Sequence, residues 1–218
     1  MKPHIKQFFK FLEKKEGREI PLAVKLVNSK DFKLTPKDLN VKGDLYLEDT
    51  SVTFLPDNLT VGRDLTLSNT PIQSLPDNLT VGRHLYLSDT DITSLPNNLT
   101  VRGDLDLTGT DITSLPDNLT VNKSLWLSDT KITSLPDNLT VGGSLSLLRT
   151  RIESLPNNLT VKGKLNLTGT RITSIPDNLK VDGVLWIWNT PLAQKYTIEQ
   201  IRSMIEKKGG HIGKIYNR

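Results

Sequence analysis

The sequence predicts a repeat solenoid: a parallel β-sheet with one short strand per 20-residue rung, few or no helices on the convex side, and helical caps at both ends. The segment Leu55–Val61 recurs with small changes every 20 residues, as far as 175–181. Each copy is followed by a step such as Leu65-Thr66-Leu67, whose period of two places both leucines on one face of a strand. No apolar pattern with a helical period fits within 20 residues. Leu59 and Val61 repeat the period of two, so we expect a second extended piece on the opposite side of the rung. Because one rung cannot bury its own leucines, the rungs must stack.

Residues 1–33 are predicted to form an N-terminal helical cap, since an open solenoid exposes apolar core at its ends. A first helix is expected to end near Gly17, and Pro21 is expected to open a second short helix over residues 21–28. The apolar spacing of the first helix is carried by Ile5, Phe8, Phe9 and Leu12.

Eight rungs are predicted over residues 34–192, and a helix-and-strand cap over residues 193–218. In the cap, Thr197 and Gln200 match a helix-capping box, Gly209 and Gly210 stop the helix, and the last eight residues add an edge strand. A Thr recurs at the same place in every rung, and we assign it to the core with its hydroxyl bonded to the backbone at the turn. These residues are Thr50, Thr70, Thr90, Thr110, Thr130, Thr150, Thr170 and Thr190.

The pattern Leu-Pro-x-x-Leu, Leu-x-Leu, x-x-Thr-x-Ile resembles the leucine-rich repeat, with Thr where the usual Asn stands. It is similar to the short, 20-residue, helix-poor bacterial form in type III secreted effectors and in many phage and gut-bacterial proteins. The resemblance spans residues 34–192 and implies a phage or bacterial effector or inhibitor that acts on a host protein. The family's leucine three residues before the strand is missing, for Gly62, Gly82 or a polar residue stands there, so a β-solenoid path on the convex side is an alternative.

The amino-acid composition bears on the cellular compartment of the protein and on the kinds of site that it can form. The chain has no cysteine, which excludes disulfides, thiolate zinc sites and a cysteine nucleophile, so we expect a cytoplasmic protein of the producing or host bacterial cell. The apolar stretch Ile20–Val27 is too short and interrupted for a signal peptide or a membrane span, so no membrane contact is expected. The formal charge of +4 is uneven: residues 31–192 hold fourteen basic against nineteen acidic residues, and the ends are basic.

No motif indicates an enzyme. The sequence has no glycine-rich phosphate loop, no serine elbow and no metal-spaced histidine pair, and His4, His84 and His211 are far apart. The ligase effectors of the resembled family carry a catalytic cysteine that this chain does not have. We therefore expect a non-enzymatic protein without cofactor or metal.

The residues that vary between rungs predict a binding face. Aromatic and acidic side chains fall at positions that point out of the strand, where rings supply buried area and charges set partner choice. Asp64, His84 and Asp104 are expected on successive strands, where two carboxylates favour a protonated histidine or a cationic partner; a solvated face is the alternative. The predicted partner-binding residues, for a protein partner, are Tyr46, Asp64, His84, Tyr86, Asp104, Asp106, Trp126, Trp186 and Trp188.

A basic rim offers an alternative partner surface. Basic residues recur in the bend before the strand, where they suit a nucleic-acid backbone, so a nucleic-acid-binding or nucleic-acid-mimicking protein is the second hypothesis. Its residues are Arg63, Arg83, Arg102 and Lys123. The sequence leaves the oligomeric state open.

Overall fold

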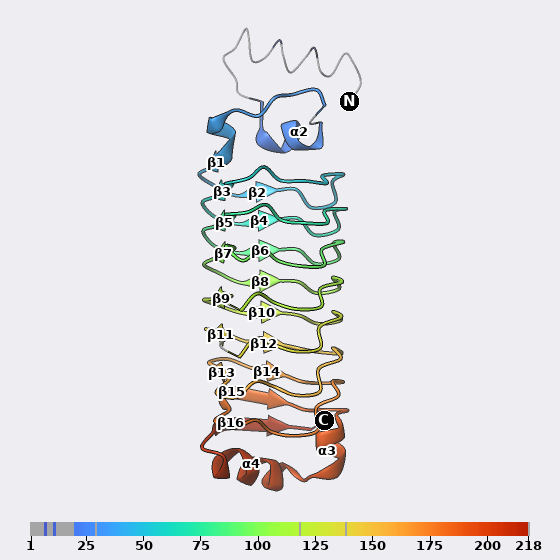
Figure 1. The fold of residues 1–218 in the computed structure, drawn as a ribbon, viewed down its shortest axis with the longest axis vertical. Coiled ribbons are helices and arrows are strands. Elements are labelled where there is room, and N and C mark those ends of the chain that lie inside the picture. Colours follow the sequence, from blue (N-terminus) through green and yellow to red (C-terminus); the bar gives the residue numbers. More distant parts are fainter. Residues whose placement is uncertain are drawn as a thin grey trace.

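Short parallel strands stacked rung upon rung form the body of the protein (Figure 1). The structure, a computed structural model, describes residues 7, 11, 20–28, 30–117, 119–137 and 139–217. Strand partners lie 20 residues apart along the chain, as in the pairs Leu65 with Leu85 and Leu125 with Leu145. The predicted parallel β-solenoid with 20-residue rungs is confirmed.

Two rows of strands run along the stack, whereas one strand per rung was expected. The first row contains β1 (Asn40–Val41), β3 (Thr60–Val61), β5 (Thr80–Val81), β7 (Thr100–Val101), β9 (Thr120–Val121), β11 (Thr140–Val141) and β13 (Thr160–Val161). The second contains β2 (Leu45–Tyr46), β4 (Leu65–Thr66), β6 (Leu85–Tyr86), β8 (Leu105–Asp106), β10 (Leu125–Trp126), β12 (Leu145–Ser146) and β14 (Leu165–Asn166).

The two rows lie side by side (Figure 1), although we expected the second extended piece on the opposite side of the rung. Only three residues separate them, as between β3 and β4, so the chain bends once and enters the next strand at once. The longer strand β15 (Lys180–Trp186) pairs with both rows and joins them into one 16-stranded sheet, and β16 (His211–Tyr216) pairs with β15.

The bend between the rows brings successive rungs into close contact. A Cβ atom at Gly142 would overlap the backbone carbonyl of Asn122 in the preceding rung. At Gly62, Gly82 and Gly142 the absence of a Cβ atom therefore allows this close approach, while other rungs carry a polar residue such as Arg102 or Asn122 at the same position.

The core fills the space enclosed by the rungs. In one rung Leu59, Val61, Leu65, Leu67 and Ile72 are all completely buried. The Thr column also faces inward, and each hydroxyl donates to the carbonyl three residues earlier at 2.6–2.8 Å, which confirms its assignment. This bond satisfies a side-chain hydroxyl that would otherwise be buried without a partner.

The turn after the second strand requires a left-handed residue in every rung. Its φ lies between 54° and 73°, a region open to glycine and tolerated by Asn and Asp. Arg149, with φ 58°, is the exception. The residues of this column are Asp49, Asn69, Asp89, Gly109, Asp129, Arg149, Gly169 and Asn189.

At the N-terminal end, α2 (Leu22–Val27) lies above the first rung (Figure 1), where the helix opened by Pro21 was predicted. The 3₁₀ helix η1 (Pro36–Leu39) follows it. The Lys25 ammonium contacts both carboxylate oxygens of Asp38 at 2.7 and 2.9 Å, and this nearly buried pair ties α2 to η1. The expected first helix, with Ile5, Phe8, Phe9 and Leu12, lies outside the described residues.

At the C-terminal end, α3 (Pro191–Lys195) and α4 (Ile198–Lys207) follow the last long strand. The capping box of Thr197 and Gln200 is present, and the edge strand predicted for the tail is β16. Ile201 and Ile205 of α4 are completely buried. Arg202 donates to the carbonyls of Ile212 and Gly213 at 3.1 and 3.0 Å, so α4 covers part of the outer edge of β16.

Candidate binding face

The outward side of the second strand row, called the strand face below, carries most of the predicted partner-binding residues. Strand pairing aligns one outward residue per rung into a single aromatic-rich column. The column runs Tyr46, Thr66, Tyr86, Asp106, Trp126, Ser146, Asn166, Trp186 and Tyr216.

Exposure differs along this column. Tyr46 and Trp186 are exposed to 59% and 38%, while Tyr86 and Trp126 are half-buried. Trp188 is 58% exposed and lies in the turn after β15, two residues beyond Trp186. Tyr216 pairs beside Trp186 and was not predicted, because the sequence did not set the register of the edge strand.

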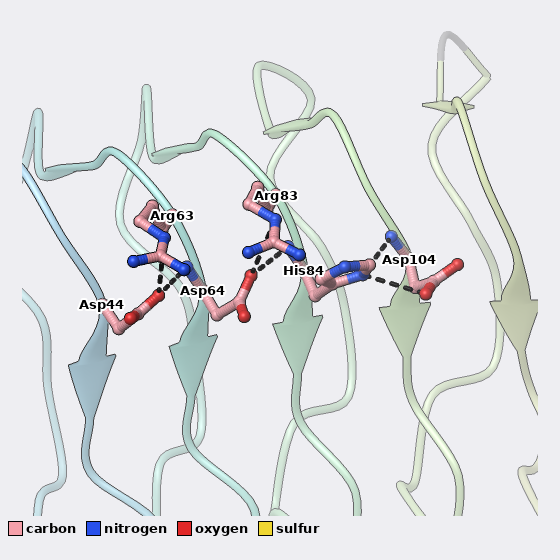
Figure 2. Close-up of polar contacts among 6 residues, drawn as sticks. All are labelled: Asp44, Arg63, Asp64, Arg83, His84 and Asp104. Carbon is pink, nitrogen blue, oxygen red and sulfur yellow. Dashed lines mark hydrogen bonds and ion pairs between the residues drawn. The ribbon is translucent and has the colours of Figure 1, made fainter.

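The neighbouring column of the strand face, called the acceptor ladder below, bonds to the backbone (Figure 2). Each side chain accepts the backbone N–H of the residue one rung later. Asp44 accepts from Asp64 at 3.0 Å, and Asp104 accepts from Ser124 at 2.7 Å. The complete ladder consists of Asp44, Asp64, His84, Asp104, Ser124 and Ser144, with donor–acceptor distances of 2.7–3.2 Å.

The bend explains why this column needs acceptors. Each ladder residue stands between the bend and the second strand, where the bend interrupts the regular pairing, and a half-buried N–H without a partner is costly. Six successive residues of the column therefore carry an acceptor atom. Lys164 carries none, and the next rung after it contains β15, which runs unbroken from residue 180 to 186.

Ion pairs join the ladder to the basic rim (Figure 2). Arg63 Nε lies 3.6 Å from a carboxylate oxygen of Asp44, and Arg83 Nε lies 3.8 Å from Asp64. The positive charge expected from a partner beside these carboxylates thus comes from the protein itself. In the part of the chain that the structure describes, Arg102 and Lys123 have no carboxylate within 4.0 Å.

His84 occupies a rung between two acids, as predicted, and its Nδ1 atom has two neighbours in the next rung. The backbone nitrogen of Asp104 lies at 3.1 Å and a carboxylate oxygen of the same residue at 2.9 Å. Nδ1 accepts the backbone N–H when it carries no proton, and it donates to the carboxylate when it does. The His84 ring also stacks on Tyr86, with centroids 5.9 Å apart.

The carboxylates shift the acidity of their neighbours. The backbone N–H of Asp64 lowers the pKa of the Asp44 carboxyl, and the Asp44 charge raises the pKa of the Tyr46 hydroxyl. Burial raises the pKa of Tyr86, and the nearby aspartates add to this effect. Both phenols therefore stay protonated near neutral pH, and the Tyr46 hydroxyl donates to the Asp44 carboxylate.

A groove of about 350 Å³ opens between Trp126 and Trp186 on the strand face. Ser144, Ser146 and Asn166 line it, and the Lys164 ammonium lies 5.5 Å from the centre of the Trp186 ring. Sequence reasoning missed this groove as a site. The available signal was the pair of small polar residues, Ser146 and Asn166, between two tryptophans in one column.

No protein-family model matches the chain, and the search of curated proteins found no match. None of the helices in the described ranges is long and apolar enough to cross a bilayer. The same ranges contain no group of three or more His, Cys, Asp or Glu side chains arranged to hold a metal ion.

Proposed function

We propose that the protein is a non-enzymatic interaction module that binds a protein partner through its strand face. The observation that carries this proposal is the aromatic column, in which Tyr46 and Trp186 project from a rigid sheet without a place in the core. Aromatic anchors on a rigid surface supply buried area at low entropic cost and dominate many protein interfaces. By its resemblance to short leucine-rich repeats, we infer a phage or bacterial effector or inhibitor that acts on a host protein in the bacterial cytoplasm.

The ion pairs refine which residues contact the partner. Asp44 and Asp64 already bond to the backbone and to arginines, and their side chains are 17% and 20% exposed. Desolvating such groups costs free energy, and little of their charge is free for a partner. The aromatic column is therefore the anchor of the proposed interface, and the ladder supports it.

One observation favours the second hypothesis, nucleic-acid binding. Arg102 and Lys123 follow each other in successive bends without a carboxylate partner in the described ranges. Arg63 and Arg83 of the same rim are engaged by Asp44 and Asp64, which leaves fewer charges for a phosphate backbone. Protein binding is favoured for that reason.

Capture from a bacterial lysate with three baits tests the two hypotheses: the unaltered protein, the double variant Tyr86→Ala with Trp126→Ala, and the double variant Arg102→Gln with Lys123→Gln. A protein retained by the unaltered and rim-substituted baits but lost from the aromatic variant supports the proposal. Gel-shift assays on DNA and RNA at two salt concentrations accompany the capture. Nucleic-acid binding that weakens with salt and fails in the rim variant would favour the second hypothesis.

A further inference from the structure

Three polar side chains that line the groove between Trp126 and Trp186 accept hydrogen bonds from the protein's own backbone. The Ser124 hydroxyl accepts from Ser144 N–H at 3.2 Å, and the Ser144 hydroxyl accepts from Lys164 N–H at 3.0 Å. Asn166 Oδ1 accepts from Thr168 N–H at 3.0 Å. Three polar side chains of the lining thus each have an acceptor atom engaged.

The hydrogen-bond donors of the same side chains are unused. Within the described ranges, the hydroxyl hydrogens of Ser124 and Ser144 and the amide hydrogens of Asn166 have no protein acceptor. Lys164 lies against the Trp186 ring, and no carboxylate of the described residues lies within 4.0 Å of its ammonium. No carboxylate lines the groove. Its polar surface therefore favours a ligand rich in acceptors and poor in donors.

The spacing of the aromatic column adds a second constraint. Tyr46, Tyr86 and Trp126 follow one another at intervals of two rungs, which is about 9.6 Å for strands about 4.8 Å apart. A polyproline II helix repeats every three residues at about 3.1 Å each, or about 9.3 Å per turn. One face of such a helix, laid along the solenoid axis, meets Tyr46, Tyr86 and Trp126 once per turn. Trp126 and Trp186 are three rungs apart, about 14.4 Å, and flank about one and a half turns of such a helix.

We propose that the strand face binds a proline-rich segment in the polyproline II conformation, seated between Trp126 and Trp186. Proline has a carbonyl acceptor but no N–H, so it matches a surface that offers donors. Its ring packs on the indoles, as in other aromatic-lined grooves that recognise such segments. Asp106, the one carboxylate of the aromatic column, is placed to pair with a basic residue beside the prolines. This inference rests on the proposed function and names the chemistry of the partner.

Isothermal titration of the purified protein with decaproline tests the inference, with a ten-residue Gly-Ser peptide as the control ligand. Ten prolines span about 31 Å, longer than the roughly 24 Å from Tyr86 to Trp186. We expect saturable binding of decaproline and none of the Gly-Ser peptide. Trp126→Ala and Trp186→Ala should each weaken binding at least tenfold, while Phe54→Ala, which removes an exposed aromatic side chain outside both strand rows, should leave it unchanged.

A second variant, Asn166→Asp, separates a loss of binding from a loss of folding. It replaces the amide donors by an acceptor of the same shape and keeps Oδ1, which in Asp106 makes the equivalent bond to Thr108 N–H at 2.9 Å. The variant should fold normally and bind decaproline at least tenfold more weakly. Absence of saturable binding, or unchanged binding by Asn166→Asp or Trp126→Ala, overturns the inference. If a captured protein depends on Tyr86 and Trp126 while decaproline does not bind, the interaction module stands and the proline-rich partner is refuted.

Discussion

The carboxylate of Asp104 accepts the backbone N–H of Ser124, one rung later, at 2.7 Å. The same kind of bond, from a backbone N–H to a side-chain acceptor in the preceding rung, repeats along the column from Asp44 to Ser144. Side chains thus complete the hydrogen bonding that the bend interrupts. Aspartate and serine both serve because either offers an oxygen at the right distance. The residue type at this column is therefore constrained by the backbone before any partner is considered.

Removing one acceptor of the ladder should destabilise the protein. Asp104→Ala leaves the Ser124 N–H half-buried without a partner and should cost about 1–3 kcal/mol in urea denaturation. Asp104→Ser supplies a hydroxyl, as Ser124 does for the following rung, and should recover most of that loss. Equal destabilisation by both substitutions would show that the hydrogen bond is not the source of the effect.

The two sides of a strand should respond differently to truncation. Leu125 is completely buried and packs between neighbouring rungs, so Leu125→Ala should cost about 2–5 kcal/mol. Trp126 points outward and is half-buried, so Trp126→Ala should cost less than about 1 kcal/mol. Urea denaturation of both variants measures the difference. A larger cost at Trp126 would contradict the assignment of faces.

The rung could be predicted from sequence because buried positions repeat with a strict period. Leu65, Leu67 and Ile72 return every 20 residues, and a recurrent apolar column has no stable place except a stacked core. The first strand row was expected only as an extended piece: Leu59 and Val61 show the same period of two, but their pairing with neighbouring rungs beside the second row was not predicted. Pairing between rungs, which the sequence does not display, makes that row a sheet.

The outward placement of the predicted residues could be read from the sequence, but the backbone hydrogen bonds of the ladder could not. The period of two places Tyr86 and Trp126 on the outside, where the structure has them. The role of Asp64 and His84 as backbone acceptors depends on which N–H groups the bend leaves unpaired, and that follows only from three-dimensional structure. Serine at residues 124 and 144 of the same column was the available clue, because serine shares the acceptor and lacks the charge.

The Lys25–Asp38 pair should make stability depend on pH. Burial raises the pKa of the Asp38 carboxyl, but hydrogen bonds from Lys25 and Thr35 outweigh it and hold the pKa below the ordinary 3.8. The folded pKa is thus lower than the unfolded one, so the stabilisation is present above about pH 3.8 and is lost as the pH falls through the folded pKa. Asp38→Asn should cost about 3 kcal/mol in urea denaturation at pH 7, and this difference should narrow below pH 3.8.

The exposed pair Lys131–Asp111 is the control for this experiment. Its distance is also 2.7 Å, but its side chains are 54% and 56% exposed. Water screens such a pair, so Asp111→Asn should change stability by less than about 1 kcal/mol. A similar loss from both substitutions would mean that burial does not strengthen the Lys25–Asp38 pair.

Arg149 should carry backbone strain at the turn. Other rungs place Asn, Asp or Gly at this position, and a larger L-residue in the left-handed region costs about 1 kcal/mol. Arg149 also forms an ion pair with Asp129 at 2.8 Å, but both side chains are largely exposed, so this pair adds little to the stability of the fold. Arg149→Gly should therefore raise stability by about 1 kcal/mol, measured as a shift in the urea midpoint. Arg149→Ala loses the same ion pair and keeps the strain, so a gain as large as that of glycine would contradict the explanation.

The C-terminal segment should protect the end of the stack from self-association. Ile201 and Ile205 bury apolar surface at this end, and Arg202 occupies two carbonyls of β16, whose outer edge would otherwise be open to another strand. Deleting residues 194–218 should therefore cause concentration-dependent association in sedimentation velocity. Arg202→Gln should cause a smaller increase, while Arg171→Gln, which removes an exposed arginine that contacts Glu153 at 3.9 Å, should cause none. Loss of this segment should expose both the apolar end of the core and an open strand edge, and at least one of them should cause association or lower the stability. A monomeric truncation with an unchanged thermal transition would therefore show that this segment is an appendage.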